Sequence, residues 1–189
     1  MQLQVIQLII FSFFIVFFFV SEHYLERKYH PYDKPQPLLT PHFAAAIIGA
    51  FLEHIIEMIC FPGLKQHSTT FFVGLILTIL GDLMRKTGII TLGRNFTLKI
   101  STKKRDEHEL VTHGIYSKIR NPSYTGWYIW TVGSQIMLCN PVCTILFTGI
   151  CWFFFADRIK YEDAYLQSFF KEQFEEYKNS VWSGIPFVP

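Results

Sequence analysis

The sequence predicts an all-α membrane protein, a polytopic bundle of about five transmembrane helices with a cytosolic C-terminal region. Half of the 189 residues are hydrophobic, and 20 of them are phenylalanine. Only 17% are charged, whereas charged residues make up about a quarter of an average soluble domain. Apolar stretches close to the ~20 residues that cross a bilayer recur along the chain.

Five stretches have the length and composition of membrane-spanning helices, at 3–20, 41–61, 69–92, 123–139 and 141–157. The last two form one charge-free run, but Asn140 precedes Pro141, and the residue before a proline is disfavoured in a helix. We therefore expect a tight helical hairpin over 123–157. Its arms are close to the shortest length that crosses a ~30 Å hydrocarbon core.

Lysine and arginine collect on the cytosolic flanks of membrane helices, so their distribution predicts orientation. If the five spans alternate, three basic residues in 27–34, nine in 85–120 and four in 158–178 fall on one side. Only Lys65 falls on the other side. This distribution predicts a cytosolic C-terminus and an N-terminus outside the cytosol. The first stretch could also be a signal peptide, but it lacks a basic leader and a small-residue cleavage site, so we expect a retained helix.

The segments outside the spans are a polar loop at 30–37, a long cytosolic segment at 94–122 and a charged tail that begins at Asp157. The tail is expected to form an amphipathic helix, because its apolar residues recur every three or four positions. Such a helix packs on the bundle or rests at the membrane interface. The apolar positions are Leu166, Phe169, Phe170, Phe174 and Tyr177.

Several classes of site are excluded by the sequence. The Rossmann fingerprint, the P-loop, the H-E-x-x-H motif and the G-x-S-x-G elbow are absent. The four cysteines lack paired spacing, so we expect small core residues rather than disulfides or a metal site. The net charge of +2 is too small to indicate nucleic-acid binding. The basic run at 103–105 is interpreted as a solvated or headgroup-facing loop.

Two groups of ionisable residues fall inside predicted spans. His54 lies near Glu53 and Glu57, and ionisable groups within a bilayer are candidates for function. The alternative, which we favour, is a buried polar contact between helices. Asp82 and Arg85 stand three residues apart, so a local ion pair is the simplest expectation.

The most informative segment, 110–126, reads L-V-T-H-G-I-Y-S-K-I-R-N-P-S-Y-T-G and leads into a long stretch without charge. It resembles the isoprenylcysteine carboxyl methyltransferases, whose pattern is close to L-V-T-x-G-x-Y-x-x-x-R-H-P-x-Y-x-G followed by a hairpin and a paired acidic motif. Weaker similarity reaches back through 81–86 and 61–66 to 21–22. The main resemblance continues through Trp127, 133–135, 138–141, 152–158, 162–163 and 184–187.

This resemblance implies an enzyme that transfers a methyl group from S-adenosylmethionine to the C-terminal carboxylate of a prenylated cysteine. Arg158 matches the arginine that the family presents to the substrate carboxylate, and no metal is implied. Asn121 stands where the family normally has histidine, and Ser101 stands where some members have glutamine. The cofactor contacts implied by motif are His108, Glu109, Leu110, Val111, Tyr116, Asn121, Pro122, Ser123, Tyr124 and Glu162.

The resemblance also implies the biological setting. The expected substrates are CaaX-processed prenylated proteins such as small GTPases, with membrane lipid around the prenyl chain and no nucleic-acid partner. The expected location is the endoplasmic reticulum membrane. Residues 1–92 would then be N-terminal transmembrane helices, and residues 93–189 a catalytic methyltransferase region with the hairpin 123–157 and a cytosolic tail.

The chemistry needs no general base, because a carboxylate with a pKa near ~3.5 is already ionised at neutral pH. It needs orientation and removal of water. Arg158 could orient the carboxylate through two parallel hydrogen bonds. Each residue also has a structural alternative: Glu162 could form an ordinary ion pair with Arg158, and the tyrosines could anchor the membrane interface.

Two other functions fit part of the pattern. Phospholipid methyltransferases and NADPH-dependent sterol reductases share a related basic, proline-containing motif, and a non-catalytic membrane scaffold could retain the same fold. The segments 138–141 and 184–187 favour the prenylcysteine enzymes.

Overall fold

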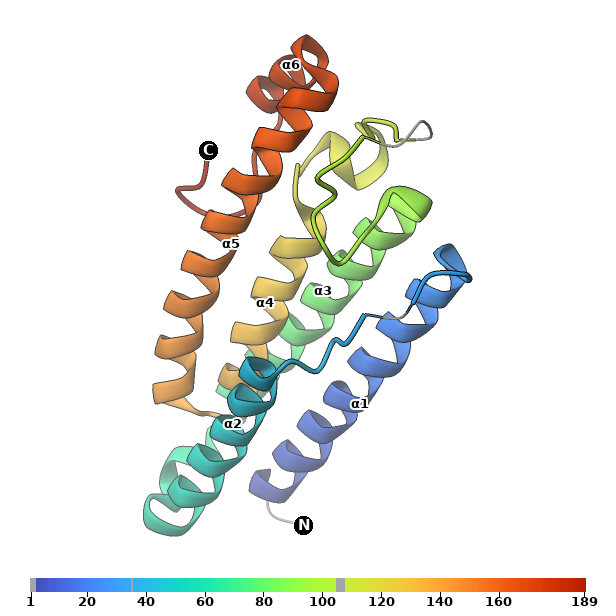
Figure 1. Ribbon diagram of the computed structural model, residues 1–189. Coiled ribbons are helices and arrows are strands. Elements are labelled where there is room, and N and C mark those ends of the chain that lie inside the picture. The colour runs from blue at the N-terminus through green and yellow to red at the C-terminus, as the bar shows by residue number, and fades with distance from the viewer. Residues whose placement is uncertain (1–2, 35, 105–107) are drawn as a thin grey trace.

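The computed structural model describes residues 3–34, 36–104 and 108–189, and all regular secondary structure within them is helical (Figure 1). The predicted all-α fold class is therefore confirmed. Three short 3-10 turns, η1 (Pro62–Gln66), η2 (Gly93–Asn95) and η3 (Gly114–Ser117), join or extend the helices. The α-helices of the described chain are α1 (Leu3–Tyr29), α2 (Pro41–Cys60), α3 (Ser68–Leu92), α4 (Pro122–Met137), α5 (Pro141–Phe170) and α6 (Glu172–Ser180).

The five long helices run lengthwise in one bundle with two distinct ends (Figure 1). The N-terminus, η1 and the turn between α4 and α5 lie at one end, which we call the hairpin end. The segment 93–121 and α6 lie at the other, which we call the loop end. The predicted break at Asn140 is confirmed, because α4 and α5 are joined by the short turn 138–140.

Helices α3 and α4 form the closest pair in the bundle because glycines face each other across them. A β-carbon at Gly81 would overlap the backbone of Trp130, and one at Gly126 would overlap the backbone of Arg85. Gly74, seven residues before Gly81, meets the end of α4 in the same way. Small residues at such positions allow two membrane helices to approach closely, so the start of α4 is held against α3.

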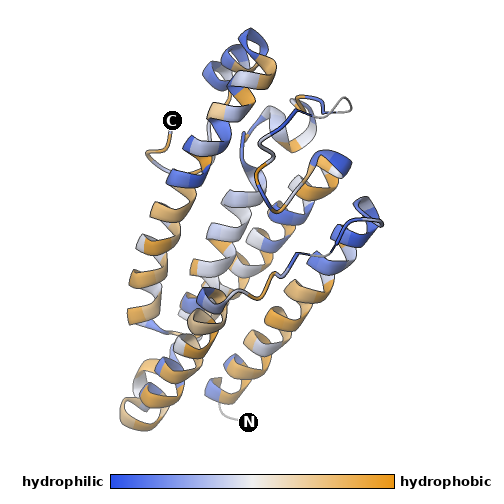
Figure 2. Ribbon diagram, in the orientation of Figure 1, coloured by the Kyte–Doolittle hydropathy of each residue, from blue (hydrophilic) through white to orange (hydrophobic). Residues whose placement is uncertain are grey.

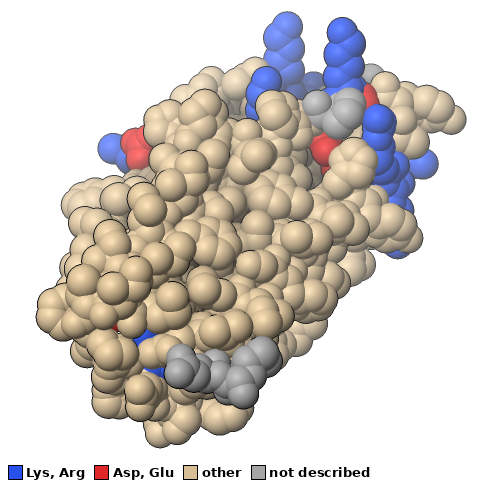
Figure 3. Space-filling model, turned by 90° about the horizontal axis from the view of Figure 1, so that it is seen from below, with Lys and Arg blue, Asp and Glu red and all other residues tan. Residues whose placement is uncertain are grey.

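Among the described helices, α1, α2 and α5 are long and apolar enough to cross a membrane. Their apolar surfaces stand out in the hydropathy colouring, whereas α4 is more polar (Figure 2). Helix α4 has only 16 residues and packs closely against α3. The face seen in Figure 3 consists mostly of residues other than Lys, Arg, Asp and Glu, and most of the visible Lys and Arg atoms lie along its upper and right margins. Five membrane crossings and the orientation of the ends stay predictions.

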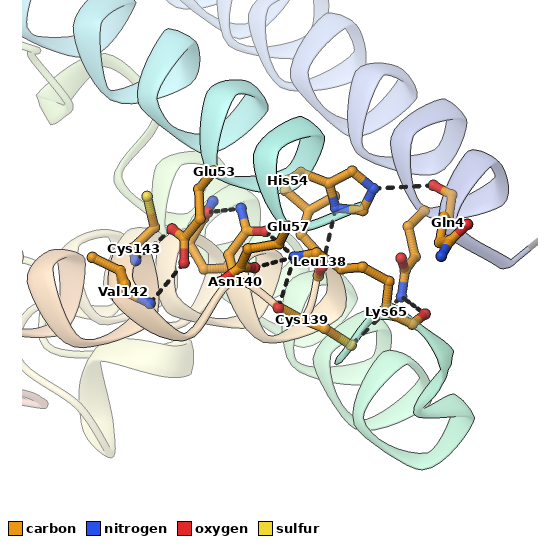
Figure 4. Close-up of polar contacts among 12 residues, drawn as sticks. Gln4, Glu53, His54, Glu57, Lys65, Leu138, Cys139, Asn140, Val142 and Cys143 are labelled. Carbon is orange, nitrogen blue, oxygen red and sulfur yellow. Dashed lines mark hydrogen bonds and ion pairs between the residues drawn. The ribbon is translucent and has the colours of Figure 1, made fainter. Parts of the chain in front are cut away.

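Lys65 is the centre of a closed polar cluster at the hairpin end (Figure 4). Its side chain has no exposed surface, and its ammonium donates to Glu57 at 2.6 Å and to the side chain of Asn140 at 2.7 Å. It also donates to the carbonyls of Leu138 and Cys139 at 3.1 and 2.8 Å. The lysine assigned to the non-cytosolic side is therefore a buried structural contact between η1, α2 and the hairpin turn.

His54 and Glu53 extend this cluster along α2 (Figure 4). The buried ring of His54 lies 3.2 Å from the carbonyl of Gln4 and 3.1 Å from that of Leu138. Glu53 accepts a hydrogen bond of 2.7 Å from the amide of Val142, in the first turn of α5. A carboxylate in that place stabilises the unpaired amides of a helix N-terminus. The interpretation of His54 as a buried polar contact is confirmed, whereas Glu53 is half-buried.

The expected local ion pair between Asp82 and Arg85 is wrong. Asp82 pairs with Lys86, one helical turn away, and Arg85 pairs with Glu22 on α1. Arg85 is buried on the face of α3 that meets α1 and α4, where a guanidinium needs a carboxylate partner that approaches from another helix.

The cysteines occupy the expected core positions only in part. Cys139 and Cys143 are buried and Cys151 is half-buried, but Cys60 is exposed at the end of α2, so its assignment to the core is wrong. In the described residues no group of histidine, cysteine and carboxylate side chains could hold a metal ion. Helix α5 continues through the start of the charged tail to Phe170. Arg105 of the predicted basic loop lies outside the described residues.

Candidate active site

A cavity opens at the loop end, between the segments 92–101 and 108–124 and the last turns of α5. Its empty volume is about 820 Å3, which includes open solvent at its mouth. Nine of the ten predicted cofactor contacts line it: His108, Glu109, Leu110, Val111, Tyr116, Asn121, Ser123, Tyr124 and Glu162.

The tenth predicted contact, Pro122, is not among the lining residues. It is buried at the first position of α4, where proline is favoured because its ring fixes a helical backbone angle and it needs no amide partner. It lies beside Gly88 of α3. Its place in the structure is to start the helix that carries the neighbouring lining residues.

Tyr124 connects Glu162 with Arg158. The tyrosine hydroxyl donates to the Glu162 carboxylate at 2.7 Å and accepts from the Arg158 Nε at 2.9 Å. The guanidinium also lies 5.3 Å from the centre of the tyrosine ring. Glu162 and Arg158, four residues apart on α5, are therefore connected through a hydroxyl from α4. This arrangement replaces the direct ion pair that the sequence offered as an alternative.

Arg158 lies beside the cavity, and its guanidinium is already partly engaged. Nε bonds Tyr124, and Nη2 donates to the carbonyl of Leu98. Two parallel hydrogen bonds from Arg158 to a substrate carboxylate, as predicted, therefore require either that Nη1 and Nη2 both donate to it or that the Leu98 carbonyl is released. Because Arg158 is half-buried, its positive charge is partly shielded from water at the place where an anion would bind.

Tyr116 and Tyr177 line the cavity together with Glu162. Burial raises the pKa of Tyr116 well above its usual range, and the nearby negative charge of Glu162 raises it further. Burial also raises the pKa of Tyr177, to about 12. The Tyr177 hydroxyl donates to the carbonyl of Tyr116 at 2.7 Å. Both groups stay neutral at physiological pH, so they supply hydrogen bonds and aromatic surface without charge.

Asn121 takes the position of the family histidine and connects the site to the C-terminal segment. Its side-chain amide donates to the carbonyl of Ser183 at 3.0 Å, and its backbone amide reaches the same oxygen at 3.1 Å. Gly184 follows with a φ of +99°, a conformation that favours glycine, and a β-carbon there would overlap the hydroxyl of Thr125. Glycine at position 184 is therefore required by its backbone conformation and by close packing against Thr125.

Arg120 is a site residue that the sequence analysis missed. It lines the cavity, is 4% exposed and bonds Asp163 on α5 at 3.2 Å. It also donates to the carbonyls of Lys178 and Val181, so it fixes α6 and the following segment to the cavity wall. The arginine in the family pattern was the available signal, but nothing in the spacing showed that its partners come from the tail.

The tail also supplies lining residues that were predicted only as packing positions. Leu166, Phe169 and Tyr177 face the cavity, and His108 lies 5.8 Å from the Phe169 ring. An amphipathic pattern indicates which face is buried but not whether the partner is the bundle or a ligand. Further lining residues without a sequence signal are Leu92, Asn95, Phe96, Thr97, Ile100 and Tyr165, and Ser101 lines the cavity as well.

A family model described as isoprenylcysteine carboxyl methyltransferase matches residues 74–168, half of the chain. The chain belongs to the isoprenylcysteine carboxyl methyltransferase family. Protein-S-isoprenylcysteine O-methyltransferase B of Arabidopsis thaliana is 47% identical over 177 residues, covering 92% of this chain and 90% of that protein. The Homo sapiens protein-S-isoprenylcysteine O-methyltransferase is 37% identical over 174 residues, covering 88% of this chain and 61% of the human protein.

The fold comparison extends the relationship to the helices outside the family model. A solved structure described as the eukaryotic intramembrane Ras methyltransferase, an isoprenylcysteine carboxyl methyltransferase, matches with a TM-score of 0.94 at 35% identity. The match covers 98% of this chain and 68% of that chain. The resemblance predicted from segment 110–126 is therefore confirmed, and α1 and α2 belong to the isoprenylcysteine carboxyl methyltransferase fold as well.

Proposed function

We propose that this membrane protein is an S-adenosylmethionine-dependent methyltransferase that esterifies the C-terminal carboxylate of prenylated cysteine. The observation that supports this most directly is the Tyr124 hydroxyl, which joins Glu162 at the cavity wall to Arg158 beside it. One side of this hydroxyl offers an anion suited to a cationic methyl donor. The other side offers a cation suited to an anionic acceptor.

The residues around the cavity fit S-adenosylmethionine. Its adenine suits the aromatic surface of Tyr116 and Phe169, because flat rings stack favourably. Its amino or ribose hydroxyl groups suit the carboxylate of Glu162 as an acceptor. When bound, it supplies a methyl group activated by a positively charged sulfur. We assign its binding to residues 93–189, with the nine motif positions that line the cavity as the expected contacts.

Arg158 would orient the acceptor. The substrate carboxylate is ionised at neutral pH, so no side chain has to remove a proton. A guanidinium holds a carboxylate in a defined plane, and correct orientation can remove roughly 7 to 11 kcal/mol of a bimolecular barrier. Exchange of the Leu98 carbonyl for the substrate carboxylate would keep Arg158 paired throughout. The buried Tyr124 contacts Arg158 and limits the access of water to it. Water weakens the nucleophilicity of a carboxylate.

The membrane supplies the rest of the substrate. A prenyl chain partitions into a bilayer with about 0.8 kcal/mol for each buried methylene, so it can reach the protein from the lipid. The proposed substrates are CaaX-processed proteins such as small GTPases, and the proposed location is the endoplasmic reticulum membrane with the loop end and the C-terminus in the cytosol.

Purified protein in lipid vesicles tests this function. With N-acetyl-S-farnesylcysteine and methyl-labelled S-adenosylmethionine, we expect a base-labile labelled ester. The carboxamide of farnesylcysteine is the matched control and should remain unlabelled, since it keeps the lipid and lacks the anion. Cofactor binding without ester formation would favour a scaffold, and binding of NADPH in place of S-adenosylmethionine would favour a reductase.

A further inference from the structure

A buried ion pair joins α1 to α3 beside the candidate site. Arg85 Nε lies 2.8 Å from one carboxylate oxygen of Glu22, and Nη2 lies 2.6 Å from the other. The exposed fractions of the two residues are 1% and 3%. The two parallel bonds fix both the distance and the plane of the guanidinium.

The free edge of the same guanidinium reaches the first turn of α4. Arg85 Nη1 donates to the carbonyl of Ser123 at 3.3 Å, and the guanidinium carbon lies 4.5 Å from the centre of the Trp127 ring. A carbonyl oxygen has two lone pairs, so Ser123 can accept this bond in addition to its helical one. A cation over an indole face is also favourable. This one arginine of α3 therefore contacts both α1 and α4.

The first turn of α4 depends on such outside contacts. Asn121 occupies the capping position, but its side chain does not cap the helix and instead donates to Ser183. The turn is thus held on one side by the C-terminal segment and on the other by Arg85. Tyr124 lies in this turn, next to Ser123, and its hydroxyl sets the contacts with Glu162 and Arg158.

We propose that Glu22 and Arg85 are positioning residues for methyl transfer. They act through Ser123, which places the Tyr124 hydroxyl against Glu162 and Arg158. This inference rests on the proposed function. It makes α1 part of the active-site architecture, although the family model begins only at residue 74.

The Glu22–Arg85 pair is better explained by the geometry that it fixes than by a contribution to the free energy of unfolding. Removing two charges from water costs about as much as their attraction returns, so a buried pair is weak evidence for stabilisation. The two parallel hydrogen bonds still fix the position of the guanidinium, and no desolvation cost cancels this geometric effect. A displacement of about 1 Å at reacting groups can lower a rate by about a hundredfold.

Glu22→Gln tests the inference, with Asp82→Asn as its matched control. Both replacements remove one carboxylate from an ion pair with a basic residue of α3, but Asp82 pairs with Lys86. In the vesicle assay we expect the Glu22 variant to lose at least tenfold in kcat. The Asp82 variant should stay within about twofold of the unchanged protein. Equal activities for the two variants at equal thermal stability would overturn the proposal.

A double-mutant cycle separates positioning from simple loss of structure. Arg85→Lys keeps the positive charge but removes the two parallel donors of the guanidinium. It offers a second variant if Glu22→Gln fails to fold. If Arg85 acts through the Tyr124 hydroxyl, then Arg85→Lys should lower kcat strongly alone and add less than twofold to Tyr124→Phe, because coupled residues are not additive. Fully additive losses would refute the proposed role.

The cycle also distinguishes this inference from the proposed function. Absence of ester with the unchanged protein would reject the methyltransferase assignment. The dissociation constant for S-adenosylmethionine would then be measured for the unchanged protein, the two single variants and the double variant. Non-additive effects on this constant would still support positioning of the first turn of α4. Additive effects would overturn it.

Discussion

The two ends of the bundle use polar residues in different ways. At the hairpin end, Lys65 is fully buried and its ammonium is surrounded by four oxygen acceptors within 3.1 Å. At the loop end, Glu162 and Tyr116 have protein partners on one side and a cavity on the other. The comparison shows that charge within a membrane bundle does not identify a functional site by itself. An opening beside the charge is also needed.

Removal of Lys65 should have the largest effect and should affect stability alone. Lys65→Met leaves Glu57 buried without its cation, which we expect to cost about 3 to 5 kcal/mol of unfolding free energy. Catalytic activity for each folded molecule should be unchanged. Denaturant titration in detergent measures the loss, with the exposed Lys118→Met as control.

A double replacement sharpens this prediction. Lys65→Met combined with Glu57→Leu should recover part of the stability, since it removes the unpaired charge as well. If the double variant is less stable than the single one, the cluster is held mainly by bonds from Glu57 to other groups. A loss of kcat without a loss of stability in either variant would contradict the conclusion that the hairpin end is structural only.

Removal of Arg158 should have the next largest effect, on activity. We expect Arg158→Ala to lower kcat/KM by about a hundredfold, or about 2.7 kcal/mol, because the substrate carboxylate loses its orienting partner. Lys160→Ala, an exposed cation on the same helix, is the control and should retain activity. Comparable losses in both variants would indicate a general electrostatic effect in place of a specific contact.

The Tyr124 hydroxyl should contribute less. Tyr124→Phe keeps the ring stacked 5.4 Å from Phe155 but removes both hydrogen bonds. We expect about a tenfold loss in kcat, which corresponds to about 1.4 kcal/mol. Steady-state kinetics of Tyr161→Phe, an exposed neighbour on α5, supply the comparison. Full activity of Tyr124→Phe would remove the hydroxyl from the proposed arrangement.

Asn121→His should have the smallest effect. The asparagine already donates to Ser183, and histidine also carries a ring donor, so we expect a change of no more than about twofold in kcat/KM. Asn121→Ala, which removes the donor, should lose more. An increase well above twofold for the histidine variant would show that the asparagine weakens the site.

Local patterns in the sequence predicted the fold class and the hairpin at Asn140, and the family resemblance indicated nine of the residues that line the cavity. These features depend on residues close together in the chain, such as the turn-rich segment 110–126. The partners of Arg85, Lys65 and Arg120 were not predictable in this way. Arg85 pairs with a residue 63 positions away, and Lys65 bonds a turn that lies 73 to 75 positions later.

The contrast between Asp82 and Arg85 shows why this information was missing. Spacing on one helix indicates which side chains can meet, but the choice between a local and a distant partner depends on which face is buried. Lys86 is adjacent to Arg85 in sequence and takes the local partner, while Arg85 turns toward α1 and α4. Only the packing of the three helices distinguishes them.

Helix α5 carries a further consequence for the reaction. Its 30 residues span about 45 Å, which exceeds a hydrocarbon core of about 30 Å by roughly 15 Å. Arg158 lies ~26 Å along the helix from Pro141. If α5 crosses the membrane as predicted, its length sets the height of the guanidinium relative to the lipid, and we expect bilayer thickness to change how well a lipid-anchored carboxylate reaches Arg158.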